Sequence, residues 1–229
     1  MPTKIIISYD GTANEEDAIA LGRTFGRAGA DLSVAYVRHA AEGDTAAEQH
    51  AQAEAQEVLE RGIGLLGIPH AGSHVVIDRS TPHGLARLAA AEGADVVIFC
   101  SDSHTAKGQV SIGNSAQALL EGGPCAVAIA PAGLAERSDA LRGIVAVADG
   151  DGGATATADE IAAALGAEVK PVIDDTTDLV VIDSRADAAP GTVSLSSSAA
   201  HLIEIVRAAT VVLPRGKTLS FSAAATPGA

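Results

Sequence analysis

The chain has 229 residues, of which 47% are hydrophobic and 19% are charged, and its formal net charge is −14. This composition is typical of a globular protein with one large core or two small ones. The acidic balance and the scattered Lys and Arg residues argue against nucleic acid as a partner, because phosphate backbones need clustered cations. No apolar run approaches the roughly 18 to 20 residues that span a bilayer, and residues 1–10 lack the features of a signal peptide. We therefore expect a cytoplasmic protein with no membrane partner.

The first half of the chain alternates predicted strands with predicted helices. Short apolar runs rich in β-branched residues are separated by segments of helical length, which predicts right-handed crossovers and a parallel sheet covered on both faces. The fold class is therefore α/β, an open, five-stranded parallel sandwich of Rossmann-like type. In chain order, the predicted strands are 4–10, 31–37, 74–78, 94–100 and 124–131, and the predicted helices are 14–27, 44–64, 81–91 and 113–121.

The sequence also contains an internal repeat. The segment from Gly108 (GQVSIGNSAQALLEGGPCAVAIAPAG) aligns without gaps, at a constant offset, on the segment from Gly191 (GTVSLSSSAAHLIEIVRAATVVLPRG). Nearer the start, IIISYDG matches IVAVADG, which places Asp10 on Asp149. The separation between these matched residues is larger than that between Gly108 and Gly191. The difference between the two offsets means that the second copy lacks a segment. This segment corresponds to about 38–94 of the first copy and contains two predicted helices and one predicted strand.

The repeat predicts two domains and a tail. A complete domain spans 1–132, a reduced second copy spans 141–216, and the small-residue tail over 217–229 is predicted to be flexible. A reduced sheet buries too little apolar surface to be stable alone, so we expect the second copy to dock on the first. The last predicted strands, 125–130 and 210–213, are the natural edges for this contact. Their pairing would give an intramolecular pseudo-dimer or, between chains, a homodimer.

In an open parallel sheet, ligands bind beyond the carboxyl ends of the strands. Asp10 follows the first predicted strand and Val37 ends the second, while Gly113 begins a predicted helix whose unpaired N–H groups and dipole suit a phosphate. A structural alternative is equally compatible with the pattern, since Asp10 can stabilise a turn and Gly113 and Ser115 can simply start a helix. With three Phe, two Tyr and no Trp in the chain, we expect an adenine site to use aliphatic walls and backbone.

Both copies resemble the universal stress protein family. The segment YDGTANEEDAIALGRTFG resembles the opening strand and helix of that family, and CSDSHTAKGQVSIGNSAQALLEGGPCAVAIAP resembles its phosphate loop, closing helix and last strand. The resemblance implies an adenine-nucleotide alpha-hydrolase-like fold that binds ATP, with Mg, or another adenine nucleotide. Carried over position by position, it implies a ligand-binding role for eight residues, which are Asp10, Val37, Cys100, Ser101, Ser103, Gly113, Asn114 and Ser115.

The phosphate loop departs from the family pattern G-x2-G-x9-G-[ST]. Cys100 and Ser103 replace its first two glycines, and Asn114 replaces the first Ser or Thr after the third. Side chains at glycine positions restrict the backbone and obstruct close approach of a phosphate, so the affinity should fall. Asp102 adds a negative charge beside the expected phosphates, with Lys107 and a mostly neutral His104 as the balancing groups.

The second copy departs further from the pattern. Asp183 takes the position of the first glycine and Ser196 that of the third, and the segment that would cover the adenine is deleted. We expect no nucleotide binding in this copy, and Ser196 to serve as a helix cap. The seven His residues are scattered without metal-ligand spacing, and Cys100 and Cys125 lie in or beside apolar runs, so we expect neither a metal site nor a disulfide.

Three functions follow from these observations. The preferred one is a non-catalytic stress-response module that binds an adenine nucleotide in the first copy and responds by a change in shape or partner affinity. The alternative is an interaction protein that has lost its ligand and acts through (pseudo)dimerisation, which the substituted glycines favour. The third is an enzyme such as a slow ATPase, which is disfavoured because no metal-holding Asp with a P-loop Lys is evident.

Overall fold

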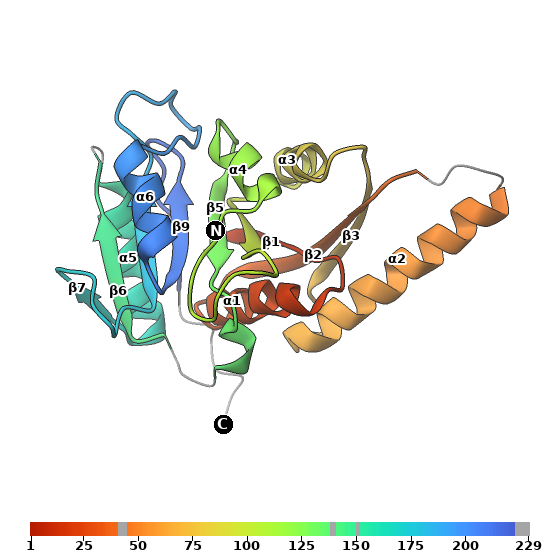
Figure 1. The fold of residues 1–229 in the computed structure, drawn as a ribbon, viewed down its shortest axis with the longest axis horizontal. Coiled ribbons are helices and arrows are strands. Elements are labelled where there is room, and N and C mark those ends of the chain that lie inside the picture. The colour runs from red at the N-terminus through yellow and green to blue at the C-terminus, as the bar shows by residue number, and fades with distance from the viewer. Residues whose placement is uncertain (41–44, 138–140, 150–151, 223–229) are drawn as a thin grey trace.

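The computed structural model describes residues 1–40, 45–137, 141–149 and 152–222. Within these residues the chain is a layered α/β structure, a twisted sheet with helices on both faces (Figure 1). The strands are β1 (Lys4–Ser8), β2 (Asp31–Arg38), β3 (Gly72–Ile77), β4 (Val96–Cys100), β5 (Ala126–Ala130), β6 (Gly143–Val147), β7 (Glu168–Lys170), β8 (Leu179–Asp183) and β9 (Ala209–Leu213).

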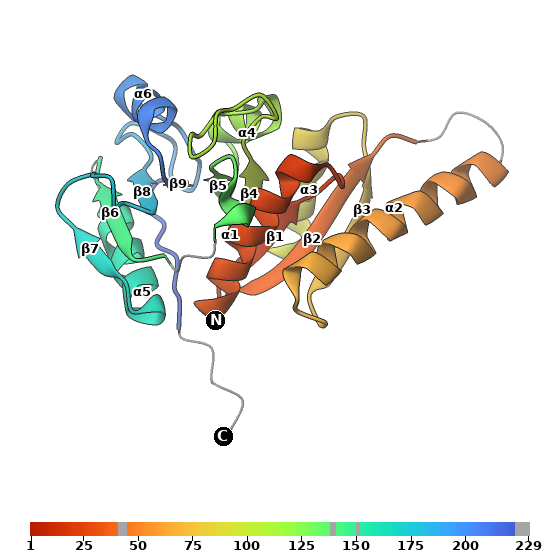
Figure 2. The same ribbon diagram turned by 60° about the horizontal axis from the view of Figure 1, so that its bottom comes forward.

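The helices form two layers that enclose two hydrophobic cores. Side chains of α1, α2 and α5 build one core and side chains of α3, α4 and α6 the other, on opposite faces of the sheet (Figure 2). The helices are α1 (Glu16–Arg27), α2 (Thr45–Leu66), α3 (Thr81–Glu92), α4 (Asn114–Leu120), α5 (Gly153–Leu165) and α6 (Ser197–Ile205), with the 3-10 turns η1 (Ala13–Glu15) and η2 (Leu134–Glu136).

Local sequence signals explain these elements. The central strands are apolar on both faces, as in β1, where Ile5, Ile6 and Ile7 are at most 1% exposed, because helices cover both sides of a parallel sheet. The cap predicted for α3 is also present, since the Ser80 side chain accepts a hydrogen bond from the backbone N–H of His83 and Pro82 lies in the first turn.

The described strands form one sheet in the order β3-β2-β1-β4-β5-β9-β8-β6-β7. The first five are parallel to one another, which confirms the predicted five-stranded α/β sandwich. The order β9-β8-β6-β7 repeats the order β5-β4-β1-β2, and these four strands are also parallel to one another. The second copy has no described counterpart of α2, β3 or α3, the elements that lie in 38–94.

The repeat also recurs in individual hydrogen bonds. The Ser101 hydroxyl after β4 donates to the carbonyl oxygen of Ala130 at 2.7 Å, and the Ser184 hydroxyl after β8 donates to that of Leu213 at 2.6 Å. Both serines and both acceptors are matched by the same ungapped alignment that places Gly108 on Gly191. The two copies therefore share their loop anchors as well as their strand order.

The two copies meet through β5 and β9, which pair in the antiparallel direction with Ala128 opposite Val211. Both strands are fully buried, and the cores on both faces continue across this junction. The last strands thus pair within the chain, as an intramolecular pseudo-dimer does. Because β5 also pairs with β4 and β9 with β8, a homodimer through these strands has no strand edge available. The domain limits given above stay a prediction, since both copies share one sheet.

The structure corrects the prediction of a flexible tail from residue 217. Leu219 and Phe221 are 4% and 7% exposed, and the Phe221 ring stacks on Phe25 of α1 with centroids 5.7 Å apart. The backbone N–H of Leu219 donates to the Thr157 hydroxyl of α5 at 3.0 Å. Two apolar side chains in a small-residue stretch therefore fix 217–222 against both copies, whereas 223–229 lie outside the described residues.

Candidate functional site

A cavity of about 390 Å³ opens at the carboxyl ends of β1, β2 and β4, where a ligand of an open parallel sheet is expected. We call it the first-copy pocket. Its size lies within the range of roughly 300–1,000 Å³ that is usual for small-molecule sites. Six of the eight residues proposed from the sequence line it, namely Asp10, Val37, Cys100, Gly113, Asn114 and Ser115.

The other two residues do not contribute to this lining. Ser101 is 1% exposed, and its hydroxyl donates to Ala130 while accepting a hydrogen bond from the backbone N–H of Ser111 at 3.1 Å. This hydroxyl therefore anchors the loop internally and does not line the pocket, in contrast to the ligand-binding position expected for it from the sequence. Ser103 lies exposed in a turn closed by a hydrogen bond from Thr105 to Asp102, away from the pocket wall.

Asp10 belongs to a hydrogen-bonded carboxyl pair that the sequence did not reveal. Its side chain accepts a hydrogen bond from the backbone N–H of Thr12 at 2.9 Å, so it does stabilise the turn, and its own backbone N–H donates to the Glu15 carboxyl group. Burial, reinforced by the hydrogen bond to Asp10, raises the pKa of Glu15 to about 9. Burial opposes ionisation of Asp10, but hydrogen bonds from Glu15 and Thr12 outweigh it and lower the pKa of Asp10.

At neutral pH the pair therefore carries one proton and one negative charge, with the charge on Asp10 and the proton on Glu15. An ionised carboxylate at this place is an acceptor for hydroxyl groups of a ligand. The signal that could have indicated the pair is the short spacing of the two residues across the turn and η1, but only the fold brings the two side chains together.

Aromatic residues line the first-copy pocket, although the chain has few of them. Tyr9, Tyr36 and Phe99 all line it, out of three Phe and two Tyr in the whole chain. The expectation that an adenine site would use aliphatic walls and backbone did not anticipate these aromatic residues. These residues lie at the ends of β1, β2 and β4 beside Asp10, Val37 and Cys100, so parallel strands bring them to one place.

Cys100 lines the pocket as a neutral thiol. Burial raises its pKa to about 12, and the side-chain amide of Asn14 donates a hydrogen bond to its Sγ at 3.2 Å. Cys125 is buried, and both cysteines are free. A thiol with this pKa does not supply the thiolate that a nucleophile requires.

The carboxylate of Asp102 lies at the start of α4, where the sequence predicts a phosphate. A Cβ atom on Gly113 would come within 2.9 Å of its Oδ1, and its Oδ2 accepts a hydrogen bond from the Ser111 hydroxyl at 3.4 Å. Lys107, the expected balancing cation, instead pairs with Glu136 at 2.6 Å. The start of α4 is therefore more acidic than the sequence suggested.

In the second copy, Asp183 stands at the position that matches Cys100 of the first copy. Asp183 is 2% exposed, and its carboxylate accepts hydrogen bonds from the backbone N–H groups of Ala154 at 2.6 Å and Asp149 at 3.4 Å. The Asp183 carboxylate thus accepts a hydrogen bond from an N–H group at the start of α5, which an anionic ligand could otherwise accept. Ser196 caps α6 by accepting a hydrogen bond from Ala199, which confirms its interpretation as a helix start.

In the described part of the chain, no group of three or more His, Cys, Asp or Glu side chains is arranged to hold a metal ion. None of the helices in this part combines the length and apolar character required to cross a membrane.

Residues 1–131 match the model of the universal stress protein family. Among solved structures, a universal stress protein from Archaeoglobus fulgidus is similar with a TM-score of 0.67 and 14% identity, over 93% of this chain and 98% of that chain. A functionally unknown protein from Pseudomonas aeruginosa is similar with a TM-score of 0.59 and 14% identity, over 93% of both chains. No curated protein matches the chain. At these identities the structural likeness concerns the fold.

Proposed function

This chain belongs to the universal stress protein family, and from that premise we propose that it is a non-catalytic stress-response module whose first-copy pocket binds the nucleoside part of an adenine nucleotide. The observation that carries the proposal is the convergence of Asp10, Tyr36 and Val37 in one cavity at the carboxyl ends of β1 and β2. An acceptor for ribose hydroxyls and an aromatic wall for a base then lie side by side.

The charges around the pocket favour a ligand with few phosphates. Asp10 and Asp102 both line it, and Lys107 is engaged by Glu136. We propose that adenosine and AMP bind better than free ATP, and that Mg improves ATP binding by reducing the repulsion from Asp102. The Cys100 thiol is neutral and supplies no thiolate nucleophile, which supports a binding role over cysteine-based catalysis.

The repeat offers a matched control for testing this function. Asp10→Asn keeps a side-chain acceptor for the Thr12 N–H and removes the charge, and Asp149→Asn makes the same change at the equivalent, exposed position of the second copy. Calorimetric titration with adenosine should show one site per chain. Affinity should fall about tenfold in Asp10→Asn, since a charge-assisted hydrogen bond contributes on the order of 1.5 kcal/mol, and remain unchanged in Asp149→Asn.

Equal affinities in the two variants would contradict the assignment of the site. ATP hydrolysis above background that disappears in Asp10→Asn, with the fold intact, would contradict the non-catalytic part of the proposal.

A second candidate function is an interaction protein without a nucleotide ligand. The Asp102 carboxylate beside Gly113 favours it, because this charge opposes a phosphate at the start of α4. This candidate predicts that adenosine, AMP and MgATP all fail to raise the midpoint of thermal unfolding at millimolar concentration, whereas a bound ligand raises the midpoint by mass action.

A further inference from the structure

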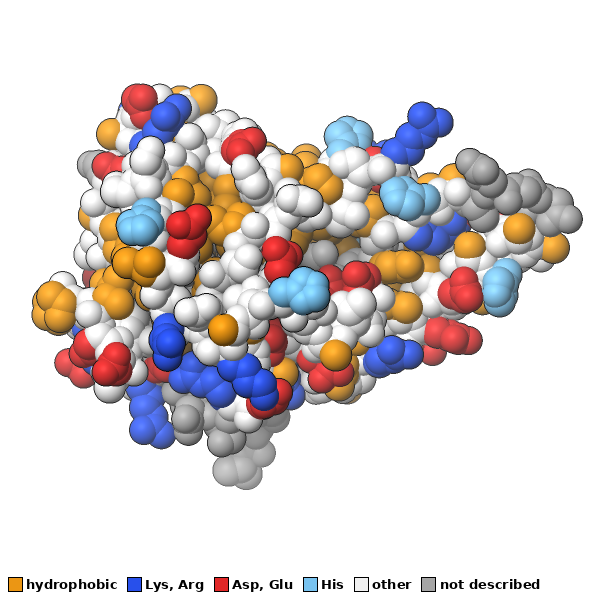
Figure 3. Space-filling view, in the orientation of Figure 1, with side chains coloured by type: hydrophobic (Ala, Val, Ile, Leu, Met, Phe, Trp, Pro, Cys, Tyr) orange, Lys and Arg blue, Asp and Glu red, His pale blue; other side chains and the backbone are white. Residues whose placement is uncertain are grey.

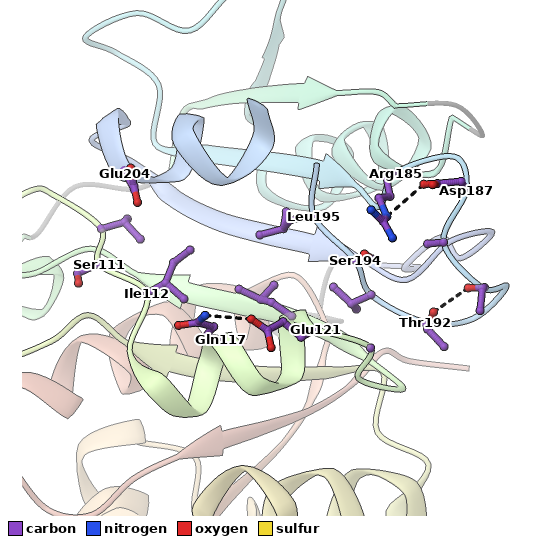
Figure 4. Close-up of a pocket in the computed structure, with 16 residues that line it drawn as sticks. Ser111, Ile112, Gln117, Glu121, Arg185, Asp187, Thr192, Ser194, Leu195 and Glu204 are labelled. Atoms are coloured by element: carbon purple, nitrogen blue, oxygen red, sulfur yellow. Dashed lines mark hydrogen bonds and ion pairs between the residues drawn. The ribbon is translucent and has the colours of Figure 1, made fainter. Parts of the chain in front are cut away.

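A second and larger cavity, of about 720 Å³, lies between the two copies (Figure 4). It is bounded by 110–122 of the first copy and by 185–195 and Glu204 of the second, and we call it the junction cavity. In the space-filling view the surface is hollowed between α6 and α4, with hydrophobic side chains at the bottom of the hollow (Figure 3). It shares no lining residue with the first-copy pocket.

Residues at equivalent positions of the repeat face one another across this cavity. Glu121 and Ser194 form an antiparallel bridge, and the backbone N–H of Val193 donates to the Gly123 carbonyl oxygen at 3.0 Å, so the two loops are joined directly. The cavity therefore has approximate twofold symmetry. Four pairs that the repeat alignment matches line it, which are Val110 with Val193, Ser111 with Ser194, Ile112 with Leu195, and Glu121 with Glu204.

This symmetry sets an apolar centre between two carboxylates. Figure 4 shows Glu121, directly after α4, and Glu204 on α6 at opposite corners, with Ile112 and Leu195 between them. Val110 and Val193 add buried apolar surface to the centre. The cavity thus has apolar side chains near its centre and one carboxylate at each of two opposite corners.

The charge of the cavity is negative on balance. Among the described residues that line the cavity, Arg185 is the one Lys or Arg, and its guanidinium pairs with Asp187 at 3.1 Å. The other charged residues of the lining are Glu121 and Glu204. Glu121 accepts a hydrogen bond from the side-chain amide of Gln117, a neutral group, at 2.9 Å. Glu204 has His201 at 3.6 Å, and both of these side chains are exposed. An anionic ligand is therefore disfavoured, and a cation at each end is favoured.

We propose that the junction cavity binds a linear aliphatic diamine or polyamine. Each terminal ammonium group would pair with one of the two glutamates, and the methylene chain would cover the Ile112 and Leu195 side chains. Such a ligand combines two point charges with an apolar connection, which matches the lining in both chemistry and symmetry. A monoamine satisfies one carboxylate only, and a compact inorganic cation leaves the apolar centre in water.

Calorimetric titration of the full chain with putrescine, spermidine and the monoamine butylamine tests the proposal. Putrescine or spermidine should bind at one site per chain, and more tightly than butylamine. Glu121→Gln and Glu204→Gln should each weaken binding about threefold to fivefold, the effect of losing one exposed ion pair. Glu60→Gln removes the same charge from an exposed position on α2 and should leave the affinity unchanged.

A chain with a net charge of −14 attracts cations in general, so the control decides the result. If Glu60→Gln weakens binding as much as Glu121→Gln, or if butylamine binds as tightly as putrescine, the proposal is wrong and the binding is non-specific. As an independent readout, putrescine should shift the methyl NMR signals of Ile112 and Leu195. Unchanged signals at saturating putrescine would also overturn it. Neither outcome depends on whether adenosine binds in the first-copy pocket.

Discussion

At the scale of single residues, the first-copy pocket is shaped by side chains whose charges are set by their neighbours. Asp10 is ionised because Glu15 and Thr12 hydrogen-bond to it, and Glu15 is protonated because it is buried beside Asp10. Asp102 places a further charge at the start of α4, near Gly113. The ligand preference that we propose for the pocket therefore depends on carboxyl groups that can be changed one at a time.

Asp102→Asn should strengthen the binding of AMP about tenfold and leave adenosine binding unchanged. Removing one negative charge near a phosphate relieves Coulomb repulsion, whereas the neutral nucleoside does not interact with that charge. The measurement is a pair of calorimetric titrations with AMP and adenosine. Asp159→Asn, an exposed change on α5, serves as the control, and equal gains for both ligands would argue against a phosphate position beside Asp102.

Glu15→Gln should alter the pH dependence of stability. The pKa of Glu15 rises from 4.5 to about 9 on folding, so in this interval the unfolded chain loses a proton that the folded chain keeps. The contribution of Glu15 to the free energy of unfolding is therefore largest at low pH and is lost as the pH rises toward about 9. Urea unfolding should show the variant gaining stability relative to the natural chain as the pH rises, and parallel pH profiles would show that Glu15 ionises normally.

At the scale of elements, the C-terminal segment 217–222 acts as a strap across both copies. It contacts α1 through the stacked rings of Phe221 and Phe25, and α5 through the hydrogen bond from Leu219 to Thr157. Gly29 approaches it so closely that a Cβ atom there would lie 1.9 Å from the Ser222 carbonyl oxygen. The strap is thus a part of the core.

Phe221→Ala should lower the free energy of unfolding by about 3 kcal/mol, the usual cost of truncating a buried aromatic side chain. Thr218→Ala changes an exposed neighbour and should cost less than about 0.5 kcal/mol. Both values come from urea unfolding followed by circular dichroism. If the two variants were equally stable, the packing of Phe221 against Phe25 would contribute nothing.

The elements were largely predictable because their signals are local. Apolar runs bounded by Gly, Pro or Asp indicated the strands, and the ungapped self-alignment indicated the repeat before any fold was known. The strap was missed because two apolar side chains in a run of small residues give no periodicity. At the site, the ends of the predicted strands pointed to Asp10 and Val37. Other features depend on contacts between segments distant in the sequence, and these are the hydrogen bond from Ser101 to Ala130, the ion pair of Lys107 with Glu136 and the aromatic residues along the pocket.

At the scale of the whole molecule, the antiparallel pairing of β5 with β9 makes two copies into one structure. The buried cores on both faces contain side chains from both copies, so neither copy can lose its structure without exposing apolar surface of the other. The strand edges that a separate domain would use for association are already paired within the chain.

The chain should therefore unfold in urea as one cooperative unit despite its length. Amide hydrogen exchange should give the same opening free energy for β1 in the first copy and β6 in the second, because both strands lie inside one continuous sheet. Exchange in β6 through a low-energy opening that leaves β1 protected would mean that the copies are independent.

We propose that the first copy binds a nucleoside and that Asp183, which accepts a hydrogen bond from Ala154 at the start of α5, prevents binding in the second copy. A crystal structure of the full chain with saturating adenosine tests it most directly. We predict one adenosine per chain, in the first-copy pocket, with its ribose against Asp10 and its base beside Tyr36. Adenosine bound beside Asp183, or its absence from the first-copy pocket at saturation, would contradict the account.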